Sequence, residues 1–495
     1  MASTVSHLKR DLLLVLSLAL AVRALSWQLL PLDWNWDSYH HWQISWLSLR
    51  VGFPQWRLWD LNGCEYYWAI FPHLVESATM ALSGSPGIQA FRLLNSILGG
   101  INAALVYQVG KRYGSPQAGL WAGLLFAAFP VAAIFDILAL QDTLALTLLL
   151  ASLYISRGKP FWSGVLLGLA GQSRTELLLV SFVVVVWVAL IDRLSTERLP
   201  TVIGWLLVTG VASVYLYNQT GNPFYNLYWS LYNIFSGSPG SGGLSFLGLM
   251  WEWVSWKLSV WPYKATGILI LTAAASTFAY FLYSLIRRPR DYQLVYFLPT
   301  AAVSAPIFLT YIGSDVRMLT IMLRVATPIV ALGAPILFGF VLLRVNPGFK
   351  AYLVALLLII TVGFYALIPA YTTYQEEAAR TMKIADDVMD LYPGGTLVCD
   401  YPMMNYRFVT RWELPEKCLL GNHYAVQYSG TAEPIDYIKW LYNNRVTLWV
   451  RYGADAEVVY SAIQRVSPKL FVEAYENSGV KVYLVDPTEL SQILG

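Results

Sequence analysis

The sequence predicts a polytopic α-helical membrane protein with a C-terminal α/β domain outside the membrane. Three observations predict this fold class. Of the 495 residues, 57% are hydrophobic and only 13% are charged, about half of the charged fraction of soluble domains. Uncharged stretches such as LLLVSFVVVVWVALI are found in the first 370 residues, whereas residues 371–495 have an ordinary composition. Basic residues also recur after every second apolar stretch, as expected of cytoplasmic loops.

Net charge and cysteine content exclude several other classes. A net charge of +3 is too small to indicate nucleic-acid binding. Three cysteines without CxxC spacing exclude a disulfide scaffold or a zinc ribbon. Lys9 and Arg10 precede the first apolar run, as in a signal peptide. That run is about twenty residues long and no small-x-small site follows it, so we expect an uncleaved first span.

Eleven apolar stretches indicate about eleven transmembrane helices. The predicted spans are 11–30, 91–110, 117–135, 142–156, 161–177, 178–192, 201–217, 265–286, 293–312, 321–343 and 350–370. The two around Arg174 could instead be one hydrophobic region broken by a polar elbow.

The distribution of Lys and Arg sets the orientation. Every even-numbered span is followed by basic residues, namely Lys111, Arg112, Arg157, Lys159, Arg193, Arg198, Arg287, Arg288, Arg290, Arg344 and Lys350. Positively charged loops remain cytoplasmic, and this alternation supports two spans within 161–192. We therefore expect a cytoplasmic N-terminus, a transmembrane domain over 1–370 and an extracytoplasmic C-terminal domain over 371–495.

Two long loops fall on the external side. The loop 31–90 is rich in Trp and Tyr, which favour the membrane interface, so we expect short helices lying along the surface. The segment 222–262 has the same character around SGSPGSGG, which predicts a mobile loop that covers the first one.

The C-terminal domain shows mixed periodicity. YQEEAARTMKIADDVMDLYP, PIDYIKWLYNN and DAEVVYSAIQRV predict helices, and TLVCD, VTLWVRYG, LFVEAYE and VKVYLVD predict strands. This alternation indicates a small α/β domain. Cys399 and Cys418 lie in it, either paired in an oxidising compartment or as free thiols.

Charged residues in or near a bilayer are costly and are functional candidates by default. In the predicted topology they gather on the external side: Asp33, Asp37, Glu65, Glu76, Asp136, Asp142, Arg174, Glu176, Asp315, Arg317 and Arg324. Arginines there run against the positive-inside bias, which suggests that they meet anions such as a lipid phosphate.

Some of these residues also have plausible local roles. Arg174 and Glu176 could simply pair at a helix end, and Asp136 is expected in a surface loop. Asp142 could cap the fourth span, which does not exclude ligand binding. His40, like its neighbour His41, could belong to an aromatic belt at the interface.

The polar cluster fits chemistry on an amphiphile whose phosphate lies at the interface. One carboxylate can serve as general base, while arginines or a divalent cation neutralise a phosphate leaving group. Asp37 is the preferred base, because Trp34, Trp36, Tyr39 and Trp42 should hold it at the interface.

Several segments, in this order, resemble the GT-C superfamily of membrane glycosyltransferases: WDSYHHWQIS, AFRLLNSILGGINAALVYQVGKRYGSPQAGLWAGLLFAAFP, FDILALQDTLALTLLLASLY and GVLLGLAGQSRTELLL. The resemblance is strongest to the branch of protein O-mannosyltransferases and aminoarabinose transferases, and more distant to the catalytic subunit of oligosaccharyltransferase. It covers residues 30–225 best and 226–345 poorly.

The resemblance implies a polyprenyl-phosphate-linked sugar donor, transfer on the extracytoplasmic face and inversion at the anomeric carbon. It places the catalytic acidic residue on Asp37 and a metal-ligand position on Asp142, with His40 as a second candidate. The metal would be a divalent cation such as Mg²⁺ or Mn²⁺. The first loop lacks a clean DxD or DE pair, and the second has Asp136 and Asp142 instead of adjacent acids, so metal dependence stays open.

The sequence thus predicts an inverting glycosyltransferase in the plasma membrane. Asp37 acts as base, while Arg174, Arg317 and Arg324 are candidates for binding the donor phosphate. Its partners would be the donor, membrane lipid and a glycan, lipid or protein acceptor. A transporter or flippase of a lipid-linked or anionic substrate is the main alternative, although the chain shows no clear inverted repeat. A non-catalytic assembly factor is a second alternative.

Overall fold

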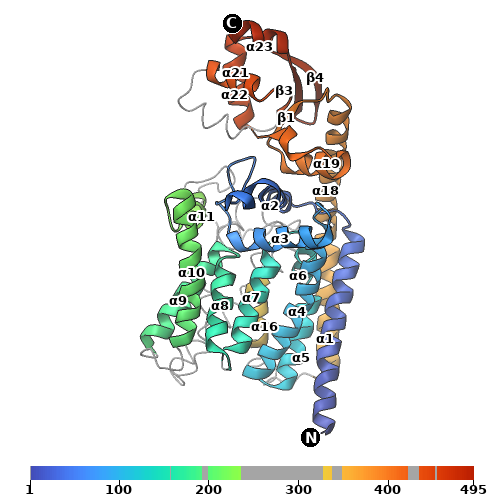
Figure 1. The fold of residues 1–495 in the computed structure, drawn as a ribbon. Coiled ribbons are helices and arrows are strands. Elements are labelled where there is room, and N and C mark those ends of the chain that lie inside the picture. The colour runs from blue at the N-terminus through green and yellow to red at the C-terminus, as the bar shows by residue number, and fades with distance from the viewer. Residues whose placement is uncertain are drawn as a thin grey trace. The chain divides into compact units, whose positions relative to one another are not determined.

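The structure, a computed structural model (Figure 1), describes residues 2–156, 158–191, 199–235, 327–336, 348–421, 434–451 and 454–494. It divides the chain into two compact units. The first contains residues 1–31, 67–72 and 92–373, and the second contains residues 32–66, 73–91 and 374–495. Each unit is described by itself.

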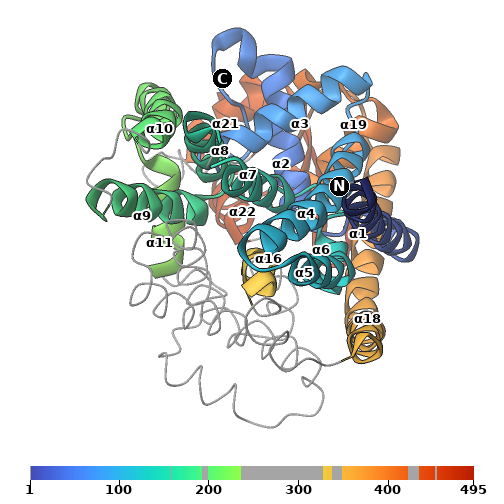
Figure 2. The same cartoon turned by 90° about the horizontal axis from the view of Figure 1, so that it is seen from below.

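The first unit is a bundle of helices. Its helices are α1 (Ala2–Leu29), most of α4 (Gln89–Tyr113), α5 (Pro116–Ala128), α6 (Pro130–Phe135), α7 (Asp142–Ile155), α8 (Pro160–Gly171), α9 (Thr175–Ile191), α10 (Leu199–Thr220), α11 (Tyr225–Phe235), α16 (Thr327–Ile336) and the first part of α18 (Phe349–Asp390). Figure 2 looks along this bundle and shows α10, α8, α7 and α4 following one another in a row.

Four helices within the described ranges are long and apolar enough to cross a membrane: Lys9–Leu29, Gln89–Arg112, Leu199–Thr220 and Leu353–Asp390. Shorter apolar helices occupy Asp142–Ile155, Pro160–Gly171 and Thr175–Val186. The predicted break within 161–192 is confirmed, because α8 and α9 are separate helices. The predicted spans 265–286 and 293–312 lie outside the described residues, so the number of eleven stays a prediction.

Close helix packing in the first unit depends on small residues. A Cβ atom on Gly164 of α8 would lie 2.0 Å from the carbonyl oxygen of Thr201, and one on Gly204 of α10 would lie 2.3 Å from that of Phe161. Glycine at both positions lets the two backbones touch, as is common between membrane helices.

One contact in this unit is consistent with the predicted alternation of cytoplasmic and external loops. Arg112, in the last turn of α4, donates a hydrogen bond through Nη1 to the carbonyl oxygen of Tyr154, near the end of α7. The ends of the second and fourth predicted spans therefore lie together. This is the arrangement that two loops on one membrane face require.

The second unit joins the segment after α1 to the C-terminal domain. Its elements are α2 (Trp36–Leu47), a π-helical turn (Ser48–Gly52), a 3-10 turn (Phe53–Gln55), α3 (Ile70–Ser83, whose first residues lie in the first unit), the last part of α18, β1 (Thr396–Cys399), α19 (Pro402–Trp412), a 3-10 turn (Glu416–Cys418), β2 (Leu419–Leu420), α21 (Pro434–Asn443), β3 (Val446–Arg451), α22 (Ala454–Val466), β4 (Phe471–Asn477), β5 (Val480–Val485) and α23 (Pro487–Leu494). The short helices expected in 31–90 are therefore present.

The C-terminal strands form one mixed sheet in the order β2-β1-β3-β5-β4. Strand β1 runs parallel to β2 and β3, whereas β5 runs antiparallel to β3 and β4. Ser478 and Gly479 connect β4 and β5 with φ angles of 51° and 81°. Two consecutive positive φ angles are the mark of a two-residue type I′ hairpin.

A buried apolar core supports this sheet. Trp449 of β3 is fully buried and packs with Tyr437 of α21 and Phe471 of β4. The predicted strands and helices are all found where they are described, whereas α19, β2 and α23 were not expected. Cys399 and Cys418 are free thiols, which is the second of the two alternatives.

Candidate functional site

Two polar side chains near the start of α4 hold neighbouring backbone segments of the first unit in place. Arg92 donates from Nε to the carbonyl oxygen of Ile137 at 2.8 Å, and from Nη1 to that of Pro31 at 2.8 Å. Asn95 donates to the carbonyl oxygens of Leu138 and Leu140 at 2.7 and 2.8 Å. Two side chains of one helix thus fix the 136–141 loop and the end of α1.

Asp136 is not a surface residue, contrary to the sequence-based expectation. Its side chain is 2% exposed and pairs with Arg23 of α1, whose side chain is 1% exposed; Arg23 Nε lies 2.9 Å from Asp136 Oδ2. Thr143 Oγ1 donates to Oδ1 at 2.6 Å. A Cβ on Gly99 would lie 2.3 Å from both Arg23 Nε and Asp136 Oδ2, so glycine leaves room for a fully paired, structural ion pair.

Asp142 also differs from its predicted capping role. It is the first residue of α7, whose N-cap is Gln141 without a side-chain cap bond. The Asp142 carboxylate instead forms an ion pair through Oδ1 with Nη1 of Arg174, from the elbow between α8 and α9. Arg174 also contacts Glu176, with Nε and Nη2 at 3.1 and 2.8 Å from its carboxylate oxygens. The predicted Arg174–Glu176 pair is therefore present, but it is part of a triad.

This triad lines a small pocket in the first unit. The lining residues are Phe135, Asp136, Asp142, Thr143, Arg174, Glu176, Leu177, Thr327 and Pro328. Oδ2 of Asp142 is buried and has no hydrogen-bond partner among the described residues. One arginine facing two carboxylates gives the three side chains a formal charge of −1. The pocket thus offers an unused acceptor oxygen next to a guanidinium.

Aromatic residues of α11 lie next to the elbow. Thr175 Oγ1 and Ser230 Oγ are 2.8 Å apart, which holds α11 beside the start of α9. On the same helix, Trp229 stacks on Tyr67 with ring centroids 4.4 Å apart, and Tyr228 packs edge-on against Trp229. The first turn of α9 is therefore bordered by an aromatic surface.

Asp37 lies in the first turn of α2, in the second unit. The side chain of Asn35 caps this helix by accepting from the backbone N–H of Asp37 at 2.9 Å. Asp37 is half-buried. Trp36 packs on Tyr401 with ring centroids 4.7 Å apart, so part of the aromatic surroundings of α2 belongs to the C-terminal domain.

His40 is one turn further along α2 and is buried, not part of an exposed aromatic belt. Its Nε2 lies 2.9 Å from Oδ2 of Asp60. Burial by itself lowers the pKa of His40, but the Asp60 carboxylate outweighs it and Asp37 adds to the effect, so the pKa is raised. Burial acts to raise the pKa of Asp60, but the charge and hydrogen bond of His40 hold it below its usual range. The two side chains therefore favour an ion pair.

The predicted site residues are thus distributed over both units. Asp142 and Arg174 meet in the first unit, whereas Asp37 and His40 share one helix in the second. Arg317 and Arg324 lie outside the described residues. The sequence analysis missed Arg23, Arg92 and Asp60. Arg23 carried a usable signal, because it is a charge inside the first apolar run.

Comparison with known proteins gives a match to one family model and several solved structures with a similar fold. Residues 69–217 match the family model described as dolichyl-phosphate-mannose-protein mannosyltransferase. Comparison with curated protein sequences gives no match. The structure of ArnT from Cupriavidus metallidurans bound to undecaprenyl phosphate is 15% identical, with a TM-score of 0.56 over 96% of this chain and 98% of that chain. Its apo structure is 14% identical, with a TM-score of 0.57 over 99% of both chains.

A lower similarity links the chain to the archaeal oligosaccharyltransferase AglB from Archaeoglobus fulgidus, in complex with an inhibitory peptide and a dolichol-phosphate. The identity is 12% and the TM-score 0.49, over 95% of this chain and 74% of that chain. The match to ArnT, in contrast, spans nearly the whole of both chains.

Proposed function

We propose that the chain is a glycosyltransferase of the GT-C superfamily, which transfers a sugar, with inversion, from a polyprenyl phosphate to an acceptor on the extracytoplasmic face of the plasma membrane. The mannosyltransferase family match over residues 69–217 and the fold shared with ArnT support this proposal. The undecaprenyl phosphate bound by ArnT, which shares the fold, supports this class of donor. The acceptor is a glycan, a lipid or a protein.

The observation that carries the proposal is the Asp142–Arg174–Glu176 triad in its pocket. A guanidinium fork matches the geometry of phosphate oxygens. In the free enzyme the two carboxylates occupy this fork. When the donor binds, a phosphate oxygen replaces one carboxylate, and Arg174 neutralises the charge that develops on the leaving polyprenyl phosphate.

Asp37 is the proposed general base. It accepts the proton of the acceptor hydroxyl while that oxygen attacks the anomeric carbon from the face opposite the phosphate. A new glycosidic C–O bond forms, the bond from the anomeric carbon to the phosphate oxygen breaks, and polyprenyl phosphate leaves with the electron pair. One displacement inverts the anomeric configuration, as in other inverting reactions on sugars. Partial burial of Asp37 limits its hydration and favours this role.

A divalent cation fits one feature of the pocket. Oδ2 of Asp142 is a buried acceptor with no partner among the described residues, and carboxylate oxygens are the ligands that Mg²⁺ and Mn²⁺ prefer. A bound cation would supply further neutralisation of the donor phosphate. The sequence predicted that Asp142 and His40 could both bind the metal. These residues belong to different units, and His40 already bonds to Asp60.

The proposal is tested with the purified full-length chain in liposomes, given a polyprenyl phosphate that carries a radiolabelled sugar. We expect label in a glycosylated product, and inverted anomeric configuration by NMR. Asp37→Ala should abolish transfer while the variant still binds the donor. The Lys439→Ala variant, at an exposed ion pair with Asp436, serves as control. Translocation of intact donor without consumption would instead identify a flippase, and full activity of Asp37→Ala would refute the base assignment.

A further inference from the structure

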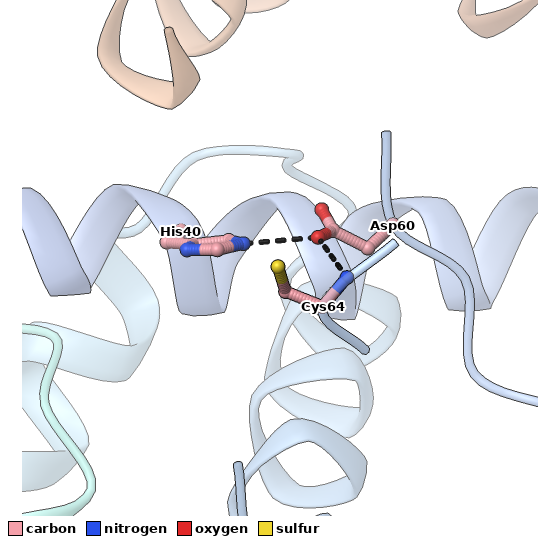
Figure 3. Close-up of side chains that lie close together, drawn as sticks. All are labelled: His40, Asp60 and Cys64. Atoms are coloured by element: carbon pink, nitrogen blue, oxygen red, sulfur yellow. Dashed lines mark hydrogen bonds and ion pairs between the residues drawn. The ribbon is translucent and has the colours of Figure 1, made fainter. Parts of the chain in front are cut away.

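Three side chains of the second unit converge next to α2, away from the triad in the first unit. They are His40 of α2 and Asp60 and Cys64 of the following loop (Figure 3). One ligand atom from each, the imidazole nitrogen, a carboxylate oxygen and the thiol sulfur, lies within 4.8 Å of the other two. Figure 3 shows the sulfur of Cys64 directed toward the gap between the His40 ring and the Asp60 carboxylate.

The distance between the His40 and Asp60 ligand atoms is close to that of zinc ligands, and the Cys64 sulfur lies within 4.8 Å of both. Zinc binds nitrogen and oxygen at about 2.0–2.2 Å and sulfur at about 2.3 Å, in tetrahedral geometry. Two ligands of such a site therefore lie about 3.3–3.8 Å apart. His40 Nε2 and Asp60 Oδ2 are 2.9 Å apart, so they need to separate by only a few tenths of an ångström. The ion would replace their hydrogen bond.

The chemistry of the set favours a particular metal. Thiolate and imidazole ligands select zinc and related transition metals, whereas Mg²⁺ and Mn²⁺ prefer oxygen alone. Three protein ligands leave one position of a tetrahedral zinc site for water. Cys64 is partly exposed, so an ion can enter from the side of the thiol.

A second layer of hydrogen bonds holds the ligands in place. Gln43 Nε2 donates to Oδ1 of Asp60 at 2.7 Å, while Oδ2 faces His40 and also accepts from the backbone N–H of Cys64 at 3.1 Å. Gln43 Oε1 accepts from Asn405 Nδ2 of α19 at 2.7 Å, and Asn62 Nδ2 donates to the carbonyl oxygen of Asp400 at 3.1 Å. Supporting bonds of this kind orient the ligands in metal sites.

The local charge also suits a cation. Burial raises the pKa of the Cys64 thiol, and the neighbouring carboxylates of Asp60, Glu65 and Asp400 raise it further. The same carboxylates make the surroundings of the thiol electronegative, which attracts a divalent cation. Binding of such a metal ion removes the proton of the coordinating thiol.

We propose that His40, Asp60 and Cys64 form a zinc site that fastens the loop 57–66 to α2. The ion would fix α2 one turn after Asp37, and through Gln43 and Asn405 it would also stabilise the packing of α2 on α19. The site does not depend on the identity of the sugar donor.

The first test uses the purified full-length chain, stripped of metal with a chelator and titrated with Co²⁺ as a probe. A Cys–His–Asp site should give a thiolate-to-cobalt charge-transfer band in the near ultraviolet, and Zn²⁺ should displace it at about one equivalent. Cys64→Ser should lose the band, whereas Cys418→Ser should keep it, because Cys418 is also a partly exposed free thiol but has no place in the cluster. A band that survives in Cys64→Ser overturns the proposal.

The second test needs no substitution, so a folding defect cannot obscure it. Zn²⁺ should slow alkylation of Cys64 in the wild-type chain about tenfold or more, because the ligated thiolate is no longer a free nucleophile. Alkylation of Cys418 in the same sample is the internal control. Equal alkylation of Cys64 with and without Zn²⁺ would show that His40 and Asp60 are an ion pair and nothing more.

A third test changes a residue that supports the ligands: Gln43→Ala should weaken Zn²⁺ binding about 10–100-fold.

Discussion

Replacing Arg174 with Gln probes the triad most directly. The Arg174 and Asp142 side chains are each only 11% exposed, so the substitution leaves a carboxylate that is shielded from water without its cation. Breaking a buried pair in this way costs about 3–5 kcal/mol. The residual exposure places the expected loss at the lower end, about 3 kcal/mol. If Arg174 also neutralises the leaving phosphate, transfer should fall about 10²–10³-fold.

The double variant Arg174→Gln/Asp142→Asn separates these two effects. Removing the Asp142 charge should recover much of the lost stability, measured as the thermal unfolding temperature in detergent, because two neutral amides can bond to each other. The remaining carboxylate, Glu176, is 25% exposed and can be hydrated. Activity with a radiolabelled donor should stay low, since the cation is still missing. Lys439→Gln, at a pair exposed by 55% and 46%, should change stability by less than about 1 kcal/mol. Recovery of activity in the double variant would show that Arg174 only balances Asp142.

Three further predictions concern other parts of the chain. Arg23→Met should destabilise the protein by about 3–5 kcal/mol, and adding Asp136→Asn should restore most of this loss in thermal unfolding, because the pair is almost fully buried. Glu76 is 1% exposed, and burial raises its pKa well above 4.5. The unfolded state therefore releases this proton first as pH rises, so that stability falls above about pH 4.5. Glu76→Gln should remove that fall and be more stable at pH 7 but not at pH 4; identical pH profiles would contradict it. Trp229→Ala should lower stability by about 0.5–1.5 kcal/mol in thermal unfolding, from loss of the stacked contact with Tyr67, whereas Trp229→Phe should retain most of it.

Hydropathy and charge periodicity were sufficient for the main elements of the fold. The predicted spans from 11–30 to 201–217 correspond to α1 and α4–α10, because length and apolar composition decide where a membrane helix forms. The C-terminal strands were found in the same way, from alternating β-branched and aromatic residues. Helix α19 was missed because PMMNYRFVTRW has low overall hydrophobicity, and its buried face packs on α2, which is far away in the sequence.

Sequence patterns did not predict which charged residues pair with each other. Asp136 was expected at the surface because its partner Arg23 is 113 residues away. Asp142 was expected to cap α7 because it precedes a strong apolar run, but the Arg174 guanidinium offers its carboxylate a stronger interaction than a backbone N–H. Asp60 was overlooked because its partner His40 is 20 residues away, at a distance that no local helix or turn spacing predicts.

The first unit contains the Arg23–Asp136 pair and the Asp142–Arg174–Glu176 triad. Comparing them suggests how a structural charge can be distinguished from a functional one. Asp136 has both oxygens bonded, to Arg23 and Thr143, and the pair is electrically neutral. Such a pair leaves no buried oxygen without a partner, although Asp136 also lines the pocket. In the triad, Arg174 is shared between two carboxylates, and Oδ2 of Asp142 lacks a partner among the described residues. A buried acceptor without a partner costs about 1–3 kcal/mol, so the arrangement is unfavourable for stability alone. It becomes favourable when a divalent cation or a hydroxyl group of the donor sugar uses that oxygen while Arg174 meets the phosphate, which is why we assign the triad, and not the better-buried Arg23–Asp136 pair, to the donor.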